Sequence, residues 1–278
     1  MNLLQIVILA IVQGAAELLP VSSSAHVIVA EKIMGLDPTT PEMTLLLVML
    51  HTGTMFAVIV YFWKAWREAY FSSLAAFRAN AINVAIATAA TGIVGVILLV
   101  ALKHIFARTN PGFEVEQLFG NARLIATGLA CAGVLIIVSA RFAQRDGGQL
   151  TDRRAACIGA VQGLCLPFRG FSRSGATIST AMALGVQRQL AEEFSFALAV
   201  VLTPPVVARE VLRLVKASHG MAHGSLLHLA GPYLLGAVLS FLAGLAALRW
   251  LSSWLKKDLW YFFGIYCLVA SLVVLSVG

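Results

Sequence analysis

The chain has 278 residues, of which 59% are hydrophobic and 12% are charged, and its mean hydropathy is +0.87. Soluble domains carry about 25% charged residues, so this composition excludes a soluble enzyme and indicates an integral membrane protein. Each helical span needs about 20 apolar residues, so the length excludes a large soluble domain. The formal charge of +7 fits loops rich in Lys and Arg on the cytoplasmic side, and we expect no nucleic-acid partner.

Six segments are long and apolar enough to cross a bilayer as helices. Two further apolar segments, 3–34 and 155–187, are each interrupted midway by a serine-rich, turn-prone cluster. Each half has about 15 residues, roughly 22 Å of helix, which reaches the middle of a membrane and returns. We therefore predict two re-entrant helical hairpins and six transmembrane helices. The six spans are expected at residues 43–63, 81–102, 121–140, 193–212, 230–249 and 259–277.

The order of these elements repeats, because a hairpin followed by three spans occurs twice. The sequence IVQG at 11–14 recurs as AVQG at 160–163, and a serine-rich turn follows both copies. An odd number of spans inverts the second copy relative to the first, and inverted-topology repeats place a binding site near the midplane. We predict an all-α integral membrane protein with a single domain over 1–278, a first repeat at 1–150 and a second at 151–278.

The distribution of Lys and Arg predicts the orientation. Eleven of the 20 such residues fall on the face opposite the termini, seven fall on the face of the termini, and Arg169 and Arg173 lie in the second hairpin. Positive residues concentrate on the cytoplasmic side. We therefore expect both termini on the outer face, with the first hairpin entering from outside and the second from the cytoplasm.

Glu17 is the one acid that falls away from predicted loops and segment ends. An isolated charge at mid-bilayer costs about 2.5–3.5 kcal/mol, so we expect the hairpin turns to meet and Glu17 to face Arg173. A buried ion pair that only fixes the hairpins is the simpler explanation, but it does not account for the polar groups beside the pair. Those groups are Gln13, Ser22, Ser23, Ser24, His26, Ser172, Ser174 and Thr177.

The second turn indicates a phosphate site. Arg173 offers paired donors to phosphate oxygens. The residues around it, 172–175, open a helix whose N–H groups and positive end attract anions. The sequence therefore predicts an anion-binding turn in the second hairpin.

The first hairpin carries groups suited to catalysis or to metal binding. Gln13 and Glu17 lie one helical turn apart, and both can supply oxygen to Mg²⁺ or Ca²⁺; alternatively, Glu17 orients His26. His26 is a candidate general base or proton shuttle, and Ser23 is a candidate nucleophile. For His51, on the first span, we favour a packing role over the alternative that it lines the polar chamber.

These motifs resemble those of the undecaprenyl pyrophosphate phosphatases, the bacitracin-resistance (BacA/UppP) family. Gln13 to Glu17 matches the family signature Glu/Gln-Gly-x-x-Glu, and Pro20 to His26 matches Pro-Val-Ser-Ser-x-Gly-His. Residues 170–177 match most of the second signature, Pro-Gly-x-Ser-Arg-Ser-x-x-Thr. Length, span number and motif order agree over essentially the whole chain.

The resemblance implies an enzyme of the bacterial plasma membrane that hydrolyses a C55 polyprenyl diphosphate to inorganic phosphate and the monophosphate carrier lipid of cell-wall synthesis. It implies catalytic roles for Glu17, Ser23, His26 and Arg173. It also implies a divalent cation, Mg²⁺ or Ca²⁺, at Gln13 and Glu17. The residues expected to contact the diphosphate are Ser22, Ser24, Arg169, Ser172, Ser174, Gly175 and Thr177.

The chain departs from the family pattern at three positions. Ala25 replaces Gly, which matters if that position needs a positive φ. Gln13 supplies an amide at the variable Glu/Gln position. Arg169 replaces Pro, either as an additional phosphate contact or as a residue that extends to the membrane interface.

The main alternative is a transporter or flippase for a phosphorylated lipid or anion, because inverted repeats with broken helices are typical of transporters. Lipid phosphatases of the vanadium-haloperoxidase type also pair Ser-Gly-His with Ser-Arg. They need a second His near a downstream Asp, however, and no such pair follows Arg173. A phosphoserine intermediate, direct attack by water, the chain-length preference and a homodimer all stay open at this point.

Overall fold

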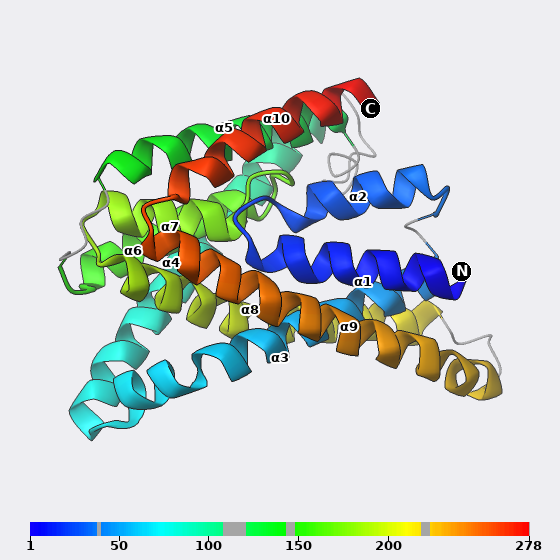
Figure 1. The fold of residues 1–278 in the computed structure, drawn as a ribbon, viewed down its shortest axis with the longest axis horizontal. Coiled ribbons are helices and arrows are strands. Elements are labelled where there is room, and N and C mark those ends of the chain that lie inside the picture. The colour runs from blue at the N-terminus through cyan, green and yellow to red at the C-terminus, as the bar shows by residue number, and fades with distance from the viewer. Residues whose placement is uncertain (38–39, 108–120, 143–147, 218–222, 278) are drawn as a thin grey trace.

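The computed structural model describes residues 1–37, 40–107, 121–142, 148–217 and 223–277. These parts of the chain are helical (Figure 1), so the prediction of an all-α protein is confirmed. The helices are α1 (Leu3–Leu18), α2 (Ser23–Ile33), α3 (Pro41–Phe71), α4 (Leu74–Ala107), α5 (Ala122–Phe142), α6 (Asp152–Cys165), α7 (Arg173–Ala183), α8 (Arg188–Ala217), α9 (His223–Lys256) and α10 (Trp260–Val277).

Two helical hairpins form where the interrupted segments predict them. Hairpin 1 consists of α1 and α2, and hairpin 2 consists of α6 and α7. α1 begins after Asn2, whose side chain forms a capping box with Gln5. α6 begins after Thr151, whose hydroxyl accepts a hydrogen bond from Arg154 N. The two hairpins approach each other from opposite ends of the molecule, and their turns meet near its middle (Figure 1).

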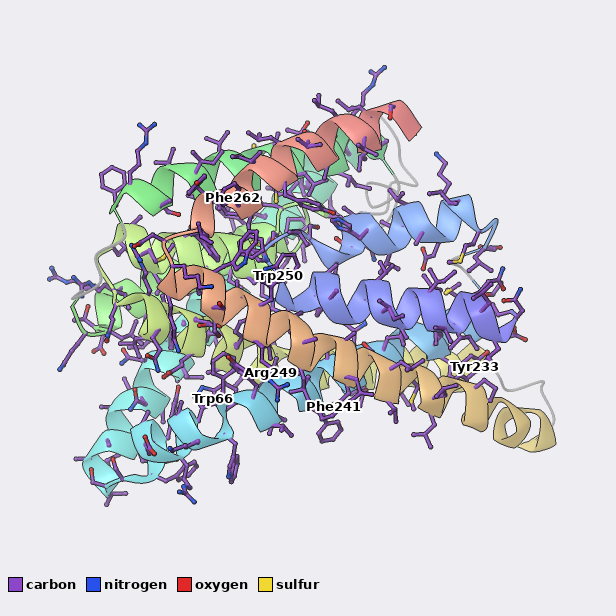
Figure 2. All side chains as sticks on the ribbon, in the orientation of Figure 1. Trp66, Tyr233, Phe241, Arg249, Trp250 and Phe262 are labelled. Carbon is purple, nitrogen blue, oxygen red and sulfur yellow. The ribbon has the colours of Figure 1, made fainter. Side chains whose placement is uncertain are left out.

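The described helices include four that are long and apolar enough to cross a membrane: Glu42–Phe71, Leu74–Phe106, Ala122–Phe142 and Gly231–Lys256. Apolar side chains project outward around the bundle (Figure 2), and Trp250 and Phe262 are among the large ones that are exposed. Lipid, in place of water, accounts for such a surface. The chain is therefore a multi-pass membrane protein. The other two predicted spans correspond to α8 and to the shorter α10, and the total of six spans stays a prediction.

Each hairpin packs against a long helix from the other half of the chain. α1 packs against α9, and α6 packs against α4. Both contacts depend on the repeated glycine, because a Cβ on Gly14 would lie 2.6 Å from Ser240 O and one on Gly163 would lie 2.8 Å from Thr91 O. Small residues of this kind let helix backbones approach closely. The recurring glycine thus has the same packing role in both halves, while the division into two repeats stays a prediction.

Candidate active site

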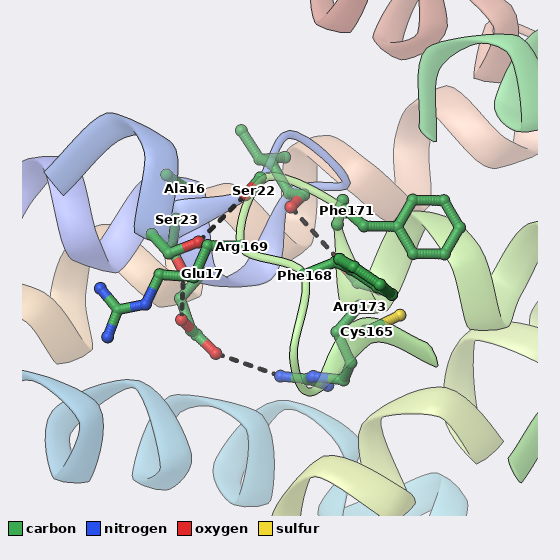
Figure 3. Close-up of a pocket in the computed structure, with 13 residues that line it drawn as sticks. Ala16, Glu17, Ser22, Ser23, Cys165, Phe168, Arg169, Phe171 and Arg173 are labelled. Atoms are coloured by element: carbon green, nitrogen blue, oxygen red, sulfur yellow. Dashed lines mark hydrogen bonds and ion pairs between the residues drawn. The ribbon is translucent and has the colours of Figure 1, made fainter. Parts of the chain in front are cut away.

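The turns of the two hairpins enclose a pocket (Figure 3). Ser174 Oγ donates a hydrogen bond of 3.2 Å to Leu19 O and so links the two turns directly. The prediction that the turns meet is confirmed. The pocket is lined by Ala16, Glu17, Leu19, Ser22, Ser23 and Ser24 of hairpin 1 and by Cys165, Phe168, Arg169, Phe171, Ser172, Arg173 and Ser174 of hairpin 2.

Glu17 accepts hydrogen bonds from three side chains. Ser23 Oγ donates to Glu17 Oε2 at 2.6 Å, and Gln13 Nε2 donates to the same oxygen at 3.0 Å. Arg173 Nη2 donates to the other oxygen, Oε1, at 3.1 Å. The predicted contact between Glu17 and Arg173 is therefore confirmed. Three donors favour the ionised carboxylate, which leaves Glu17 able to accept a proton.

His51 also lies beside the Glu17 carboxylate. Its Nε2 lies 3.8 Å from Glu17 Oε2, and its Nδ1 is bonded to Leu47 O at 2.7 Å. The ring therefore lies beside the acid with its side chain 40% exposed, although His51 is not among the residues that line the pocket.

The position of the Ser23 hydroxyl depends on a strained residue before it. Ser22 has φ 66° and ψ 93°, and α2 begins immediately after it. A left-handed conformation costs a non-glycine residue about 1–2 kcal/mol. The Ser22 side chain makes no capping hydrogen bond to α2. The positive φ thus falls at Ser22, whereas Ala25 lies inside the helix, where alanine is favourable.

The turn of hairpin 2 forms an anion cradle around Arg173. Ser172 caps α7 by accepting a hydrogen bond of 3.2 Å from Gly175 N. Arg173 Nη1 is buried and has no hydrogen-bond partner among the described residues. The first N–H groups of a helix also lack partners within it and attract anions. The turn therefore retains donors for a phosphate group.

Arg169 lies at the edge of the pocket and is exposed. In the view of Figure 3 its side chain extends away from Arg173, on the other side of Glu17. The residue after it, Gly170, has φ 94°, and a Cβ there would overlap Ile125 O. The turn therefore requires glycine at 170, and it places a second guanidinium, that of Arg169, in the pocket lining.

Three predicted site residues, Gln13, Thr177 and Gly175, lie outside the pocket lining and form hydrogen bonds to residues that line it. Gln13 is buried and reaches the pocket only through its bond to Glu17. Thr177 is buried, donates to Arg173 O at 2.8 Å and is bonded to Ser195 Oγ at 2.6 Å. Gly175 N donates a hydrogen bond to Ser172 Oγ. Thr177 and Gly175 are therefore not among the residues that line the pocket.

His26 also lies outside the pocket lining. Its Nδ1 is bonded to Ser22 O at 2.8 Å, and its Nε2 is bonded to the hydroxyl of Tyr266, on α10, at 2.6 Å. The two rings stack with their centroids 5.6 Å apart. The sequence contains no signal for this contact, because its partners are 240 positions apart.

The donor set limits how the site could hold a cation. Glu17 is the sole carboxylate among the lining residues, and the described part of the chain contains no group of three His, Cys, Asp or Glu side chains arranged to hold a metal ion. Mg²⁺ is commonly held by one or two carboxylates together with substrate phosphates and water. The residues therefore fit a cation that is shared with a phosphorylated ligand.

Comparison with known proteins agrees with the motifs. Residues 6–273 match the sequence profile of a family described as bacitracin resistance protein BacA. Over 281 aligned residues the chain is 58% identical to undecaprenyl-diphosphatase 2 of Acinetobacter baylyi, covering 100% of this chain and 99% of that relative. It is 34% identical to the undecaprenyl-diphosphatase of Desulfatibacillum aliphaticivorans, covering 99% and 98% of the two chains. It is 30% identical to that of Korarchaeum cryptofilum, covering 99% of each.

Proposed function

This chain belongs to the bacitracin resistance protein BacA family, and from that membership we propose that it hydrolyses undecaprenyl diphosphate to undecaprenyl monophosphate and inorganic phosphate. One observation in the structure carries the proposal: the Ser23 hydroxyl is bonded to the Glu17 carboxylate, which in turn is bonded to the Arg173 guanidinium. A base that is hydrogen-bonded to both a nucleophile and an anion stabiliser brings together the groups that phosphoryl transfer needs.

In the first step, Ser23 Oγ attacks the terminal phosphorus while its proton passes to Glu17. The new bond joins Oγ to phosphorus, and the bond from phosphorus to the bridging oxygen breaks, so that the monophosphate lipid leaves. Arg173 and the N–H groups at the start of α7 stabilise the charge on the equatorial oxygens.

In the second step, a water molecule attacks the phosphoserine. The bond between phosphorus and Ser23 Oγ breaks, and Glu17 returns its proton to that oxygen. Inorganic phosphate leaves, and the pair of Ser23 and Glu17 is restored. The short bond between these two side chains favours Ser23 over a water molecule as the first nucleophile, and it favours Glu17 over His26 as the base.

We also propose a divalent cation, Mg²⁺ or Ca²⁺, for this reaction. Glu17 would hold it from the protein side, together with the oxygens of the diphosphate, and Gln13 would support the site through the hydrogen bond that its Nε2 donates to Glu17. When bound, the cation offsets the charge of the diphosphate and polarises its phosphoryl oxygens.

For the membrane topology we propose six spans and two re-entrant hairpins in an inverted repeat, with both termini on the outer face of a bacterial inner membrane. The approach of the hairpins from opposite ends of the molecule supports the inversion. The packing of α1 on α9 and of α6 on α4, each through an equivalent glycine, supports the repeat.

The test is phosphate release from C55 polyprenyl diphosphate by the purified protein in detergent. We expect release with Mg²⁺ or Ca²⁺, slower release with chelator, and release reduced about 10³-fold or more in Ser23→Ala. A transporter or flippase needs no nucleophile beside a base. Absence of release from the wild-type protein under every cation condition would therefore contradict hydrolysis and favour transport.

A further inference from the structure

Both ring nitrogens of His26 have hydrogen-bond partners. Ser22 O is a carbonyl and can only accept, so the Nδ1 atom beside it carries a hydrogen and donates to it. In the neutral imidazole the other nitrogen, Nε2, then has a free lone pair and accepts from the Tyr266 hydroxyl. Neither nitrogen is left to take a proton from Ser23.

The chain of bonds through His26 ends at a backbone carbonyl. It runs from the Tyr266 hydroxyl through the His26 ring to Ser22 O, and a carbonyl cannot pass a proton onward to the pocket. The same bonds therefore do not form a proton relay. They do hold in place the carbonyl of Ser22, the residue with positive φ whose neighbour carries the reacting hydroxyl.

α10 holds the turn of hairpin 1 at a second point as well. Cys267, the residue after Tyr266, is buried, and its Sγ donates to Pro20 O at 3.3 Å. Pro20 precedes the strained Ser22 by two residues, and His26 follows it by four. Two adjacent residues of α10 therefore fix the turn on both sides of Ser22.

We propose that His26 and Tyr266 form a clamp that holds Ser22 in its left-handed conformation, so that Tyr266 is a positioning residue for the Ser23 hydroxyl. This inference rests on the proposed phosphatase function. Without the clamp, Ser22 relaxes to a negative φ, which redirects the chain at Ser23 and separates its hydroxyl from Glu17. A misplacement of about 1 Å at a reacting group can cost about 100-fold in rate.

The first test compares two substitutions of His26 in the full-length enzyme. The amide nitrogen of Asn occupies about the place of His Nδ1, so His26→Asn keeps the donor to Ser22 O but cannot serve as a base. We expect kcat to fall about 100-fold in His26→Ala and to stay within about 10-fold of wild type in His26→Asn, with the pH profile unchanged in His26→Asn. Equal inactivity of both variants in folded protein, or loss of one limb of the pH profile in both, would overturn the clamp.

The second test removes the hydroxyl of Tyr266. In Tyr266→Phe the stacked ring remains but the hydrogen bond is lost, so we expect kcat to fall about 3- to 10-fold with KM unchanged. Tyr261→Phe is the matched control, because Tyr261 also lies on α10 and stacks on Phe262. An equal effect of the two substitutions would overturn the role of Tyr266.

The third test uses glycine to remove the strain. Gly adopts a positive φ without a steric penalty, so a clamp is needed less in Ser22→Gly. We expect His26→Ala to lower kcat clearly less in the Ser22→Gly background than in the wild-type background, as a double-mutant cycle measures. Equal losses in both backgrounds would show that His26 acts independently of Ser22. If Ser23→Ala is inactive while these variants contradict the clamp, the proposed function stands and only the inference fails.

Discussion

The two hairpins share one plan but differ in the conformation of their serine turns. In hairpin 2, Ser172 has φ −50° and caps α7 through its side chain. In hairpin 1, Ser22 has φ 66° and makes no side-chain cap. The relaxed turn presents helix N–H groups and Arg173 to an anion, whereas the strained turn presents the hydroxyl of Ser23 to Glu17. Strain thus occurs only in the hairpin that is proposed to react, as is common at active sites.

The repeated glutamine differs between the hairpins in the same way. Gln13 donates to Glu17, the acid four residues later. Gln162 donates at 3.1 Å to Thr91 Oγ1 on α4, and the residue four positions after it is Leu166. One copy of the motif thus contacts the acid of the pocket, and the other copy joins hairpin 2 to α4.

Removal of the acid from hairpin 1 has the largest expected effect. Glu17→Gln leaves a polar side chain of the same size but no base, so we expect kcat to fall about 10³-fold in phosphate-release assays. Leu166→Ala, at the corresponding position of hairpin 2, is the control and should retain activity within about threefold. Similar losses in the two variants would remove the distinction between the hairpins.

Substitution of Arg173 in hairpin 2 is expected to have the second-largest effect on activity. Arg173→Lys keeps the charge but loses the planar pair of donors, so we expect kcat/KM to fall about 10²-fold. The measurement is steady-state hydrolysis together with elution volume in detergent to verify folding. Full activity of the lysine variant would show that only a positive charge is needed.

Arg169 is expected to contribute less, because it lies at the exposed edge of the pocket. In Arg169→Ala we expect KM to rise about 10-fold with kcat nearly unchanged, the pattern of a lost binding contact. A fall in kcat at constant KM would instead place Arg169 in the transition state. Unchanged kinetics would favour the alternative that it only extends to the membrane interface.

The smallest expected effect on kcat comes from substitution of Gly163 in hairpin 2. Gly163→Ala brings a Cβ against the backbone of α4, so we expect the free energy of unfolding to fall about 1–3 kcal/mol with kcat within about threefold. Gly14→Ala makes the equivalent contact one turn from Glu17 and should lower both stability and kcat. Thermal unfolding in detergent measures the loss of stability, and phosphate release measures the change in kcat.

The hairpins and the central charge pair could be predicted because both follow from the cost of polar groups in lipid. A serine cluster in the middle of an apolar segment marks a turn, and Glu17 at depth requires a partner such as Arg173. The recurrence of Gln-Gly at 13–14 and 162–163 predicts two related halves without any knowledge of how the glycines pack. These are local or energetic signals that a single sequence carries.

The arrangement around His26 could not be predicted, because it depends on tertiary structure. Nothing near His26 in the sequence indicates Tyr266, and a histidine three residues from Ser23 is equally compatible with a base and with a clamp. The same holds for the positive φ, which the family pattern left open at Ala25 and which the structure has at Ser22. The position of His51 likewise depends on tertiary structure, since the packing of α3 beside α1 brings it to Glu17.

The central claim is that the hydroxyl bonded to Glu17 is the group that attacks phosphorus. Rapid acid quench of a single turnover, followed by mass spectrometry of the peptide that contains Ser23, tests it most directly. We predict one phosphoryl group on Ser23 that forms with the monophosphate lipid and decays as inorganic phosphate appears. Formation of the monophosphate by Ser23→Ala at the wild-type rate would contradict the account.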